Sequence, residues 1–327
     1  MAKQRIFITG IYRSGTTLIS RMLNNHPKLW ITYDSVHFMR FSYGRFDPVS
    51  RRGNAERLIK DTAERIARRY DMSMDAAAVM KRAARSGKMS YRSLYDAMMA
   101  ELMSEYKPGA GGWGEKTNVC WGKIPGFLEI FPEGKAIHVI RDPRDVMCSY
   151  RDMTYEPGYS YLDSAFASLD AFQSATEFAK AYPKNYYLLK YETLLSEPAA
   201  EARKVCDFLG VDFRTSMLDT SKFTDQKGKW WTGDSSYVRK MNKITNKTID
   251  RWKTKANGLE VYFVEMINRD QMPAYGYKLS GTDIGNADWS KVYRIIHENK
   301  ILKERYLRWL KTGKGVEAYP SNPLAKA

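Results

Sequence analysis

The sequence predicts an α/β protein, because two short apolar segments each run through a loop into a helix. Residues 5–9 (RIFIT) and 136–140 (AIHVI) are rich in β-branched and aromatic side chains, as buried strands are. A glycine-containing loop and apolar residues at helical spacing follow the first segment, and an Asp-Pro pair follows the second. Both loops are therefore expected at the carboxyl ends of strands, where open α/β sheets bind their ligands.

The first loop, residues 10–17 (GIYRSGTT), nearly matches a nucleotide phosphate-binding loop. A strand, a glycine turn and a helix start present backbone N–H groups and a positive helix end to an anion. A Walker loop requires a lysine where this chain has Thr16, and its cation comes earlier, at Arg13. The loop is therefore predicted to bind a phosphate group, but its sequence argues against hydrolysis of a nucleoside triphosphate. An ordinary tight turn between strand and helix is the alternative.

The second loop is predicted to bind another phosphate. Asp142 and Pro143 form a helix start, with a capping oxygen followed by proline at the first helical position. Arg141 stands at the end of the preceding strand, and Ser149 lies two helical turns further on, near the same face. A guanidinium group and a hydroxyl suit a phosphate monoester, although an Arg-Asp pair that ties a loop is the alternative.

Together the two loops resemble those of sulfotransferases that use 3′-phosphoadenosine 5′-phosphosulfate (PAPS). The segment RSGTT matches the 5′-phosphosulfate loop, written with Arg as in protein-tyrosine sulfotransferases and many bacterial members. The segment from Arg141 to Ser149 resembles the 3′-phosphate motif R-D-P-x-D-x-x-x-S. The resemblance implies a P-loop-like parallel sheet with helices on both faces, related to nucleotide kinases. It also implies that the cofactor is held by Arg13, Ser14, Gly15, Thr16, Thr17, Arg141 and Ser149.

Further matches extend the resemblance from about residue 5 to about residue 277. The segment 113–117 (WGEKT) resembles one common in bacterial sulfotransferases and assigns Lys116 as a catalytic lysine. The segment 188–194 carries Tyr191, which the resemblance places near the adenine. Trp231–Ser236 resembles the W-x-G-N-S-S loop that closes over the cofactor, which implies a contact of Ser236 with the reacting phosphosulfate. Arg251 aligns with a basic residue near the 3′-phosphate.

The general base is predicted from a departure from the cytosolic pattern. Cytosolic members carry K-T-H, whose histidine is the base, whereas this chain has Asn118, which cannot accept a proton at neutral pH. Protein-tyrosine sulfotransferases use a carboxylate after the first helix, and the same spacing from Arg13 leads to Asp34. Asp34 is therefore the predicted base, with His37 in reserve. The alternative for Asp34 is a helix cap for residues 35–41.

The predicted reaction is in-line transfer of the sulfuryl group from PAPS to an acceptor hydroxyl or amine, which releases 3′-phosphoadenosine 5′-phosphate (PAP). A phenol, a tyrosine or a carbohydrate hydroxyl is the favoured acceptor. Arg13 is expected to stabilise the bridging oxygen and the 5′-phosphate, and Lys116 to reach the sulfonate. No metal is expected, because phosphate is already a stable leaving group. A P-loop kinase and a non-catalytic polyanion-binding module are the alternatives.

Composition bears on partners and location. The net charge of +16 predicts a positive field that attracts a multiply charged cofactor and an acidic acceptor. No basic tail or nucleic-acid module is recognisable, so nucleic acid is not an expected partner. No run approaches the roughly 18 apolar residues of a membrane span. The first predicted strand begins within five residues, which leaves no room for a signal peptide. The three cysteines have no metal-type spacing and are interpreted as reduced thiols. These two observations predict a cytoplasmic protein.

The chain is predicted to divide at about residue 278. Residues 1–278 form the sulfotransferase-like domain, with a helical insertion at about 50–106. Residues 279–327 form a helical extension, in which a single amphipathic helix is expected from about Trp289 to Leu310. This helix is predicted either to cover the core or to bury against a second subunit and form a homodimer.

Overall fold

The computed structural model describes residues 4–85, 87–152, 160–231, 243–283 and 285–318, and it contains a five-stranded parallel sheet. The strand order is β2-β3-β1-β4-β5, and every neighbouring pair is parallel. The strands are β1 (Arg5–Gly10), β2 (Leu29–Tyr33), β3 (Gly112–Lys116), β4 (Lys135–Ile140) and β5 (Tyr186–Lys190). The predicted α/β fold class, including both predicted strands, is confirmed.

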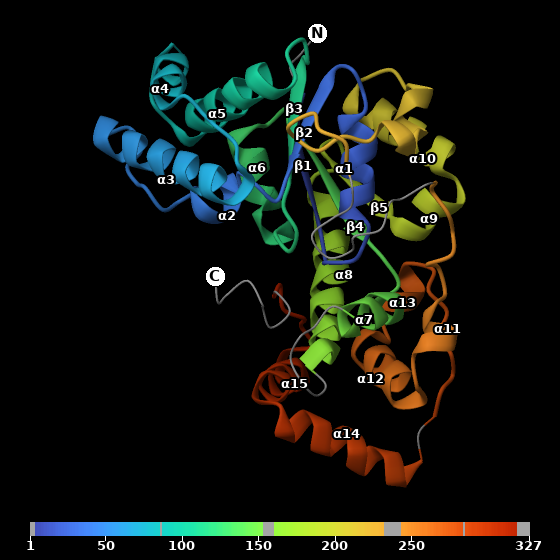
Figure 1. Ribbon diagram of the computed structural model, residues 1–327. Helices are drawn as coiled ribbons and strands as arrows, with labels where there is room; N and C mark the ends of the chain where they lie inside the picture. Colours follow the sequence, from blue (N-terminus) through green and yellow to red (C-terminus); the bar gives the residue numbers. More distant parts are fainter. Residues whose placement is uncertain (1–3, 86, 153–159, 232–242, 284, 319–327) are drawn as a thin grey trace.

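Helices connect the strands and cover both faces of the sheet (Figure 1). Those between β1 and β4 are α1 (Thr16–Asn24), α2 (Phe38–Phe41), α3 (Arg52–Tyr70), α4 (Ala76–Ala84), α5 (Tyr91–Tyr106) and α6 (Ile124–Ile130). After β4 come α7 (Pro143–Arg151), α8 (Ser164–Ala181), α9 (Tyr191–Ser196), α10 (Pro198–Leu209), α11 (Trp252–Lys255), α12 (Gly258–Asn268), α13 (Gln271–Ala274), α14 (Asn286–Glu298) and α15 (Lys300–Thr312). Short 3₁₀ helices lie at Trp121–Lys123, Ser160–Asp163, Thr215–Leu218 and Thr220–Lys222.

Successive side chains of a strand point to opposite faces of the sheet, so the hydrophobic core is divided into two clusters, one on each face. Ile6 and Ile8 pack with apolar residues of α1, α9 and α10, whereas Phe7 packs into a larger cluster with α5, α6 and α8. Because both faces are covered, the sheet is buried on both sides, as parallel sheets usually are.

The predicted helical insertion corresponds to α3, α4 and α5, which lie together on one side of the sheet in Figure 1. Asp75 caps α4 by accepting from the backbone N–H groups of Ala77 and Ala78, and Ser90 caps α5. Leu58 of α3 and Leu94 of α5 are buried in the larger cluster. The insertion therefore shares its core with the sheet.

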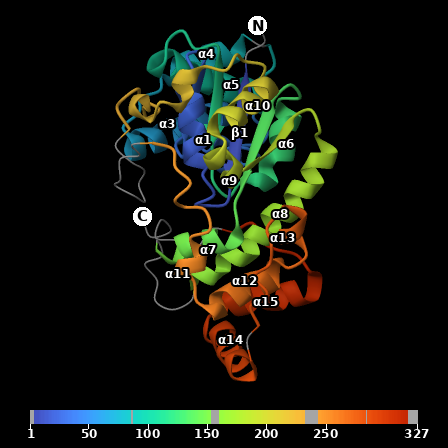
Figure 2. The ribbon, with the colours of Figure 1, turned by 90° about the vertical axis from the view of Figure 1, so that its right-hand side faces the viewer.

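The C-terminal extension contains two helices, so the prediction of one continuous helix was wrong. The apolar spacing continues across Asn299, but Asn299 has an extended backbone and its side chain accepts from Leu302 N, which starts α15 anew. Val292 and Leu302 are fully buried in the larger core cluster, so the helices cover the core. Figures 1 and 2 both show α14 at the end of the molecule opposite the N-terminus.

Beyond α15 the chain packs closely against α8. Val316 N donates to Phe166 O at 3.1 Å, and Gly122 N donates to Glu317 Oε1 at 3.0 Å. A Cβ atom on Gly315 would lie 2.2 Å from Asp170 N, so only glycine fits there. This segment thereby joins α8 to the loop after β3.

Two expectations from composition can be compared with the described residues. The three cysteines are free and buried, as predicted. Over these ranges, none of the helices combines the length and the apolar character needed to span a bilayer.

Candidate active site

Five of the predicted site positions gather at one edge of the sheet, because each follows or ends a different parallel strand. The strands β1 to β5 lead in turn to Arg13, Asp34, Lys116, Arg141 and Tyr191. In the sheet, β2 and β3 lie on one side of β1, and β4 and β5 lie on the other. The strand order therefore changes direction at β1, and open α/β sheets form their ligand sites at the carboxyl ends of the strands at such a point.

The loop after β1 is held in a tight turn that leaves no room for larger residues. Ser14 donates both its N–H and its hydroxyl to Ile11 O, at 3.2 and 2.7 Å. Gly15 has φ +95°, and a Cβ there would lie 2.1 Å from Tyr191 Cδ2. The Tyr191 ring therefore lies directly on the loop, and both the backbone conformation and this contact require glycine.

The first turn of α1 adds backbone donors to this loop. Thr16 and Thr17 are its first residues, and Gly15 provides no side-chain cap. N–H groups in a first helical turn lack intrahelical partners and carry the positive end of the helix dipole. The loop and the start of α1 therefore present donors and a positive helix end on the same side, an arrangement that suits an anion.

Asp34 and Lys116 form an ion pair beside this loop. Lys116 Nζ donates to Asp34 Oδ2 at 2.5 Å, and the lysine side chain is 1% exposed. Asn118 Nδ2 approaches the same carboxylate at 3.4 Å, while Asn118 Oδ1 accepts from Thr16 Oγ1 at 2.6 Å. Burial alone would raise the pKa of Asp34, but the charge and the hydrogen bond of Lys116 outweigh it and lower the pKa. The carboxylate is thus charged at neutral pH and tied to α1.

Asp34 is not a helix cap, so that alternative was wrong. The helix that follows begins at Phe38, and Asp34 has φ +51°. Its backbone N–H donates to Lys116 O at 2.9 Å, which extends the pairing of β2 with β3. The side chain is therefore left to pair with Lys116.

His37, the reserve base, is buried and uncharged. Its Nδ1 lies 3.2 Å from Thr117 Oγ1, and burial lowers the pKa of the imidazole to about 3. Next to it, the buried carboxyl of Glu115 accepts from Phe38 N at 3.2 Å and from the Tyr95 hydroxyl. Burial raises the pKa of Glu115. This network fixes the segment after Asp34 to β3, and sequence reasoning had not assigned Glu115 this role.

Arg13 contacts both Ser149 and Arg141 of the second loop. Arg13 Nε donates to Ser149 Oγ at 2.8 Å, and Arg141 Nη1 donates to Arg13 O at 2.9 Å. Arg141 Nη2 donates to Thr248 O at 2.7 Å, and its guanidinium lies 4.6 Å from the Tyr191 ring centroid. The two phosphate-type loops are therefore physically joined.

Arg251 lies at the C-terminal end of α7, the helix that carries Ser149. Its Nη2 donates to Asp152 Oδ2 at 2.8 Å. The buried Asp145 carboxylate accepts from Asp250 N at 3.0 Å and Trp252 N at 2.9 Å, which ties this segment to α7. Burial raises the pKa of Asp145 to about 6. Ser236 lies outside the described residues.

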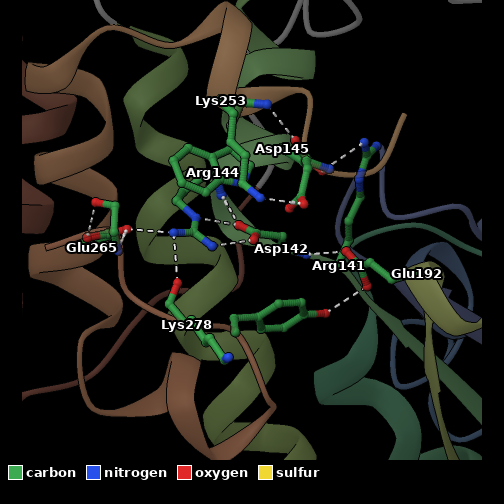
Figure 3. Close-up of polar contacts among 12 residues, drawn as sticks. Arg141, Asp142, Arg144, Asp145, Glu192, Lys253, Glu265 and Lys278 are labelled. Carbon is green, nitrogen blue, oxygen red and sulfur yellow. Dashed lines mark hydrogen bonds and ion pairs between the residues drawn. The ribbon is translucent and has the colours of Figure 1, made fainter. Parts of the chain in front are cut away.

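A buried network that the sequence analysis missed supports the second loop (Figure 3). Arg144 lies between Asp142 and Glu265, with ion pairs of 2.6 Å to each. Glu192 accepts from Asp142 N at 2.8 Å and from the Tyr277 hydroxyl at 2.9 Å. The start of α7 is thereby fixed to α9 and α12. The contacts with Glu265 and Glu192 join segments that are too distant in sequence for local patterns to reveal.

Within the described ranges, no cluster of His, Cys, Asp and Glu side chains is arranged to hold a metal ion.

A parallel sheet of this order, with an anion-binding loop after its first strand, defines a P-loop-like α/β protein. Residues 5–215 match the family model described as the sulfotransferase family. The chain therefore belongs to the sulfotransferase family and is an enzyme that transfers sulfuryl groups.

Individual relatives agree with this assignment. The chain is 23% identical over 339 residues to the nodulation protein NoeE of Sinorhizobium fredii, which covers 94% of this chain and 72% of that protein. It is 21% identical over 258 residues to a putative protein-tyrosine sulfotransferase of Caenorhabditis briggsae, covering 76% and 81%. The sulfotransferase domain of the Synechococcus PCC 7002 olefin synthase shares the fold, with a TM-score of 0.51, 18% identity and coverage of 81% and 94%.

Proposed function

We propose that this sulfotransferase transfers the sulfuryl group of PAPS to an acceptor hydroxyl or amine, with a phenol, a tyrosine or a carbohydrate hydroxyl as the favoured acceptor. PAPS supplies the sulfuryl group on a phosphate that is itself a stable leaving group, so the protein has to position and neutralise charge. The observation that carries the proposal is the Asp34–Lys116 ion pair, tied through Asn118 to Thr16. It pairs a base and a cation at the end of the anion-binding loop.

Two buried guanidinium nitrogens without hydrogen-bond partners support the proposal that the cofactor carries a 3′-phosphate. Arg141 Nε and Arg251 Nε are buried, and neither has a hydrogen-bond partner among the described residues. A buried donor without a partner costs about 1–3 kcal/mol, which a phosphate oxygen would offset. Arg141, Ser149 and Arg251 therefore hold the 3′-phosphate. Tyr191 lies near the adenine.

The loop after β1 holds the other end of the cofactor. Arg13 and the segment from Ser14 to Thr17 bind the 5′-phosphate through the guanidinium and the loop amides. Ser236 is proposed to contact the reacting phosphosulfate, as the resemblance implies. These groups supply the positive potential that the site needs without a metal.

Asp34 and Lys116 have separate roles in the proposed reaction. Asp34 accepts the proton of the acceptor hydroxyl, which its lowered pKa allows because the carboxylate is ionised at neutral pH. Lys116 donates from Nζ to the sulfonate and stabilises the charge there. His37 is neutral and is the second candidate for the base. A cytoplasmic location and a homodimer remain predictions of the sequence.

The experiment is a thermal-shift assay followed by labelled-sulfate transfer. At about 100 times its dissociation constant, PAP would stabilise the protein by roughly 2.7 kcal/mol. The shift should require the 3′-phosphate, be absent with the 5′-monophosphate and be lost in Arg141→Ala. Arg52→Ala, at an exposed ion pair on α3, is the matched control and should respond like the unaltered protein. A shift with magnesium ATP but none with PAP would contradict the proposal.

A further inference from the structure

The large apolar side chains that this protein exposes are concentrated on its two C-terminal helices. Within the described ranges six such side chains are exposed, and five of them belong to α14 and α15. Single exposed apolar side chains are normal on a protein surface, but a group of them indicates a contact surface. We call this group the C-terminal surface, and its members are Trp289, Tyr293, Ile301, Leu307 and Leu310.

Both helices bury one face and leave the opposite face outside. Val292 and Ile295 of α14 and Leu302 of α15 are buried in the larger core cluster. Because the two helices contact each other and pack on the same cluster, their exposed faces point away from it. Figures 1 and 2 both place α14 and α15 at the end of the molecule opposite α4. The C-terminal surface is therefore open to a partner that approaches this end.

The outward side chains include aliphatic groups and two aromatic rings. Leu307 and Leu310 lie three residues apart on one face of α15 and are 54% and 58% exposed. Trp289 meets the Tyr262 ring of α12 edge to face, with centroids 5.5 Å apart, and still exposes 39% of its surface. The ring of Tyr293 is also exposed. Tryptophan and tyrosine are the side chains that favour a boundary between an apolar and an aqueous phase.

Positive charges accompany these side chains. Residues 286–318 contain eight Lys or Arg residues and four Asp or Glu residues. Arg305 is half-buried and pairs with Asp163, whereas the other seven cations are exposed. On α15, Lys303 and Lys311 each lie four residues from Leu307, so they stand beside it on the same face. The C-terminal surface thus combines apolar side chains with an excess of positive charge.

An anionic lipid bilayer fits this combination better than a second protein does. Five of the seven exposed cations are lysines, which are depleted from interfaces between proteins. A second copy of the chain would place the same cations opposite one another, because a symmetric dimer uses one surface twice. At a bilayer, by contrast, apolar side chains enter the boundary of the acyl chains while lysines reach the lipid phosphates.

We infer that α14 and α15 dock this protein on the surface of a bilayer that contains anionic lipids. Leu307 and Leu310 enter the headgroup region, and Lys303 and Lys311 contact lipid phosphates. The contact is peripheral, since none of the described helices is long and apolar enough to span the bilayer. The inference goes beyond the proposed sulfuryl transfer and does not depend on the cofactor.

The test is co-sedimentation of the full chain with vesicles of phosphatidylcholine and with vesicles that also contain phosphatidylserine. The protein should sediment with the mixed vesicles only, and less of it should do so as salt screens the attraction. Leu307→Gln combined with Leu310→Gln should lower the partition coefficient about tenfold or more, because these side chains no longer enter the bilayer. Lys303→Glu combined with Lys311→Glu should lower it by a similar factor.

Two controls match these changes elsewhere on the chain. Arg52→Glu combined with Lys60→Glu changes the net charge equally at exposed positions of α3 and should alter the partition coefficient less than about threefold. Trp230→Gln removes the exposed apolar ring outside the two helices and should have a similarly small effect. The melting temperature of each variant checks that it is folded.

Three outcomes would overturn the inference. The first is a lack of binding to the mixed vesicles. The second is an equal loss in the α15 and α3 charge variants with none in the leucine variant, which would show that overall positive charge binds the lipid. The third is a dimer, measured by light scattering, that dissociates in the leucine variant, which would assign the C-terminal surface to a second copy of the chain.

Discussion

Replacing Asp34 by asparagine separates catalysis from stability. Asparagine tolerates the left-handed backbone at this position (φ +51°) and still accepts a hydrogen bond from Lys116. The ion pair would become a hydrogen bond from the lysine ammonium to a neutral amide oxygen, which costs about 1–2 kcal/mol of unfolding free energy. In a protein of this size the melting temperature should fall by only a few degrees.

The loss of catalysis should be much larger. A general base contributes about 10²–10⁴-fold, so kcat of Asp34→Asn should fall by that factor while the affinity for PAP changes little. Because the pKa of Asp34 is lowered, the unaltered enzyme should not lose activity through this group between pH 8 and about pH 5. The variant should recover rate as pH rises toward the phenol pKa of about 10, where the acceptor ionises by itself.

The assay is steady-state sulfate transfer across pH, with calorimetric titration of PAP. Glu56→Gln removes an exposed carboxylate of α3 and serves as the control. A variant that retains more than about a tenth of kcat, or one whose rate shows no recovery at high pH, would refute the assignment of Asp34 as the base.

Three other changes test neighbouring features. Arg141→Lys keeps the charge but loses the planar fork, so calorimetry should show PAP affinity reduced about tenfold or more and 5′-monophosphate affinity unchanged; equal losses would contradict its 3′-phosphate role. Gly15→Ala should lower the unfolding free energy by about 1–3 kcal/mol, because the added Cβ is strained at φ +95° and meets the Tyr191 ring. A double-mutant cycle with Tyr191→Ala should show coupling between the two changes, and additive effects would contradict the contact between Gly15 and the ring. Folding raises the pKa of Asp145 from 3.8 to about 6, so its stabilising contribution is full below about pH 4 and lost as pH rises through 6. The unfolding free energy of the unaltered protein minus that of Asp145→Asn, from urea titrations, should therefore fall between pH 4.5 and 7, and a constant difference would contradict the buried-carboxyl argument.

Local patterns were enough to predict the units that carry the site. Asp142 caps α7 by accepting from Arg144 N at 2.9 Å, and Arg141 follows the end of β4, as the strand and the Asp-Pro pair indicated. These features depend on neighbouring residues, whose spacing is visible in the sequence. The gathering of strand ends then follows from a parallel sheet.

Contacts between distant segments could not be predicted in the same way. Arg144 and Glu265 are 121 residues apart, and nothing in either neighbourhood indicates the other. The packing of Tyr191 on Gly15 is equally non-local. The break at Asn299 was missed for another reason: the apolar spacing continues through it, so periodicity by itself predicts one helix where the Asn299 cap starts a second.

The close approach of residues 313–318 to α8 limits how this protein can be shortened or tagged. A chain ended at residue 215, the limit of the family match, would expose the Gly122 N–H and remove the Glu265 partner of Arg144. Fusion immediately after Gly313 would replace Gly315, where any side chain meets the α8 backbone. In both ribbon views β1 lies far from α14 and α15, so the side of the molecule at which β1 begins is the better place to attach an affinity tag.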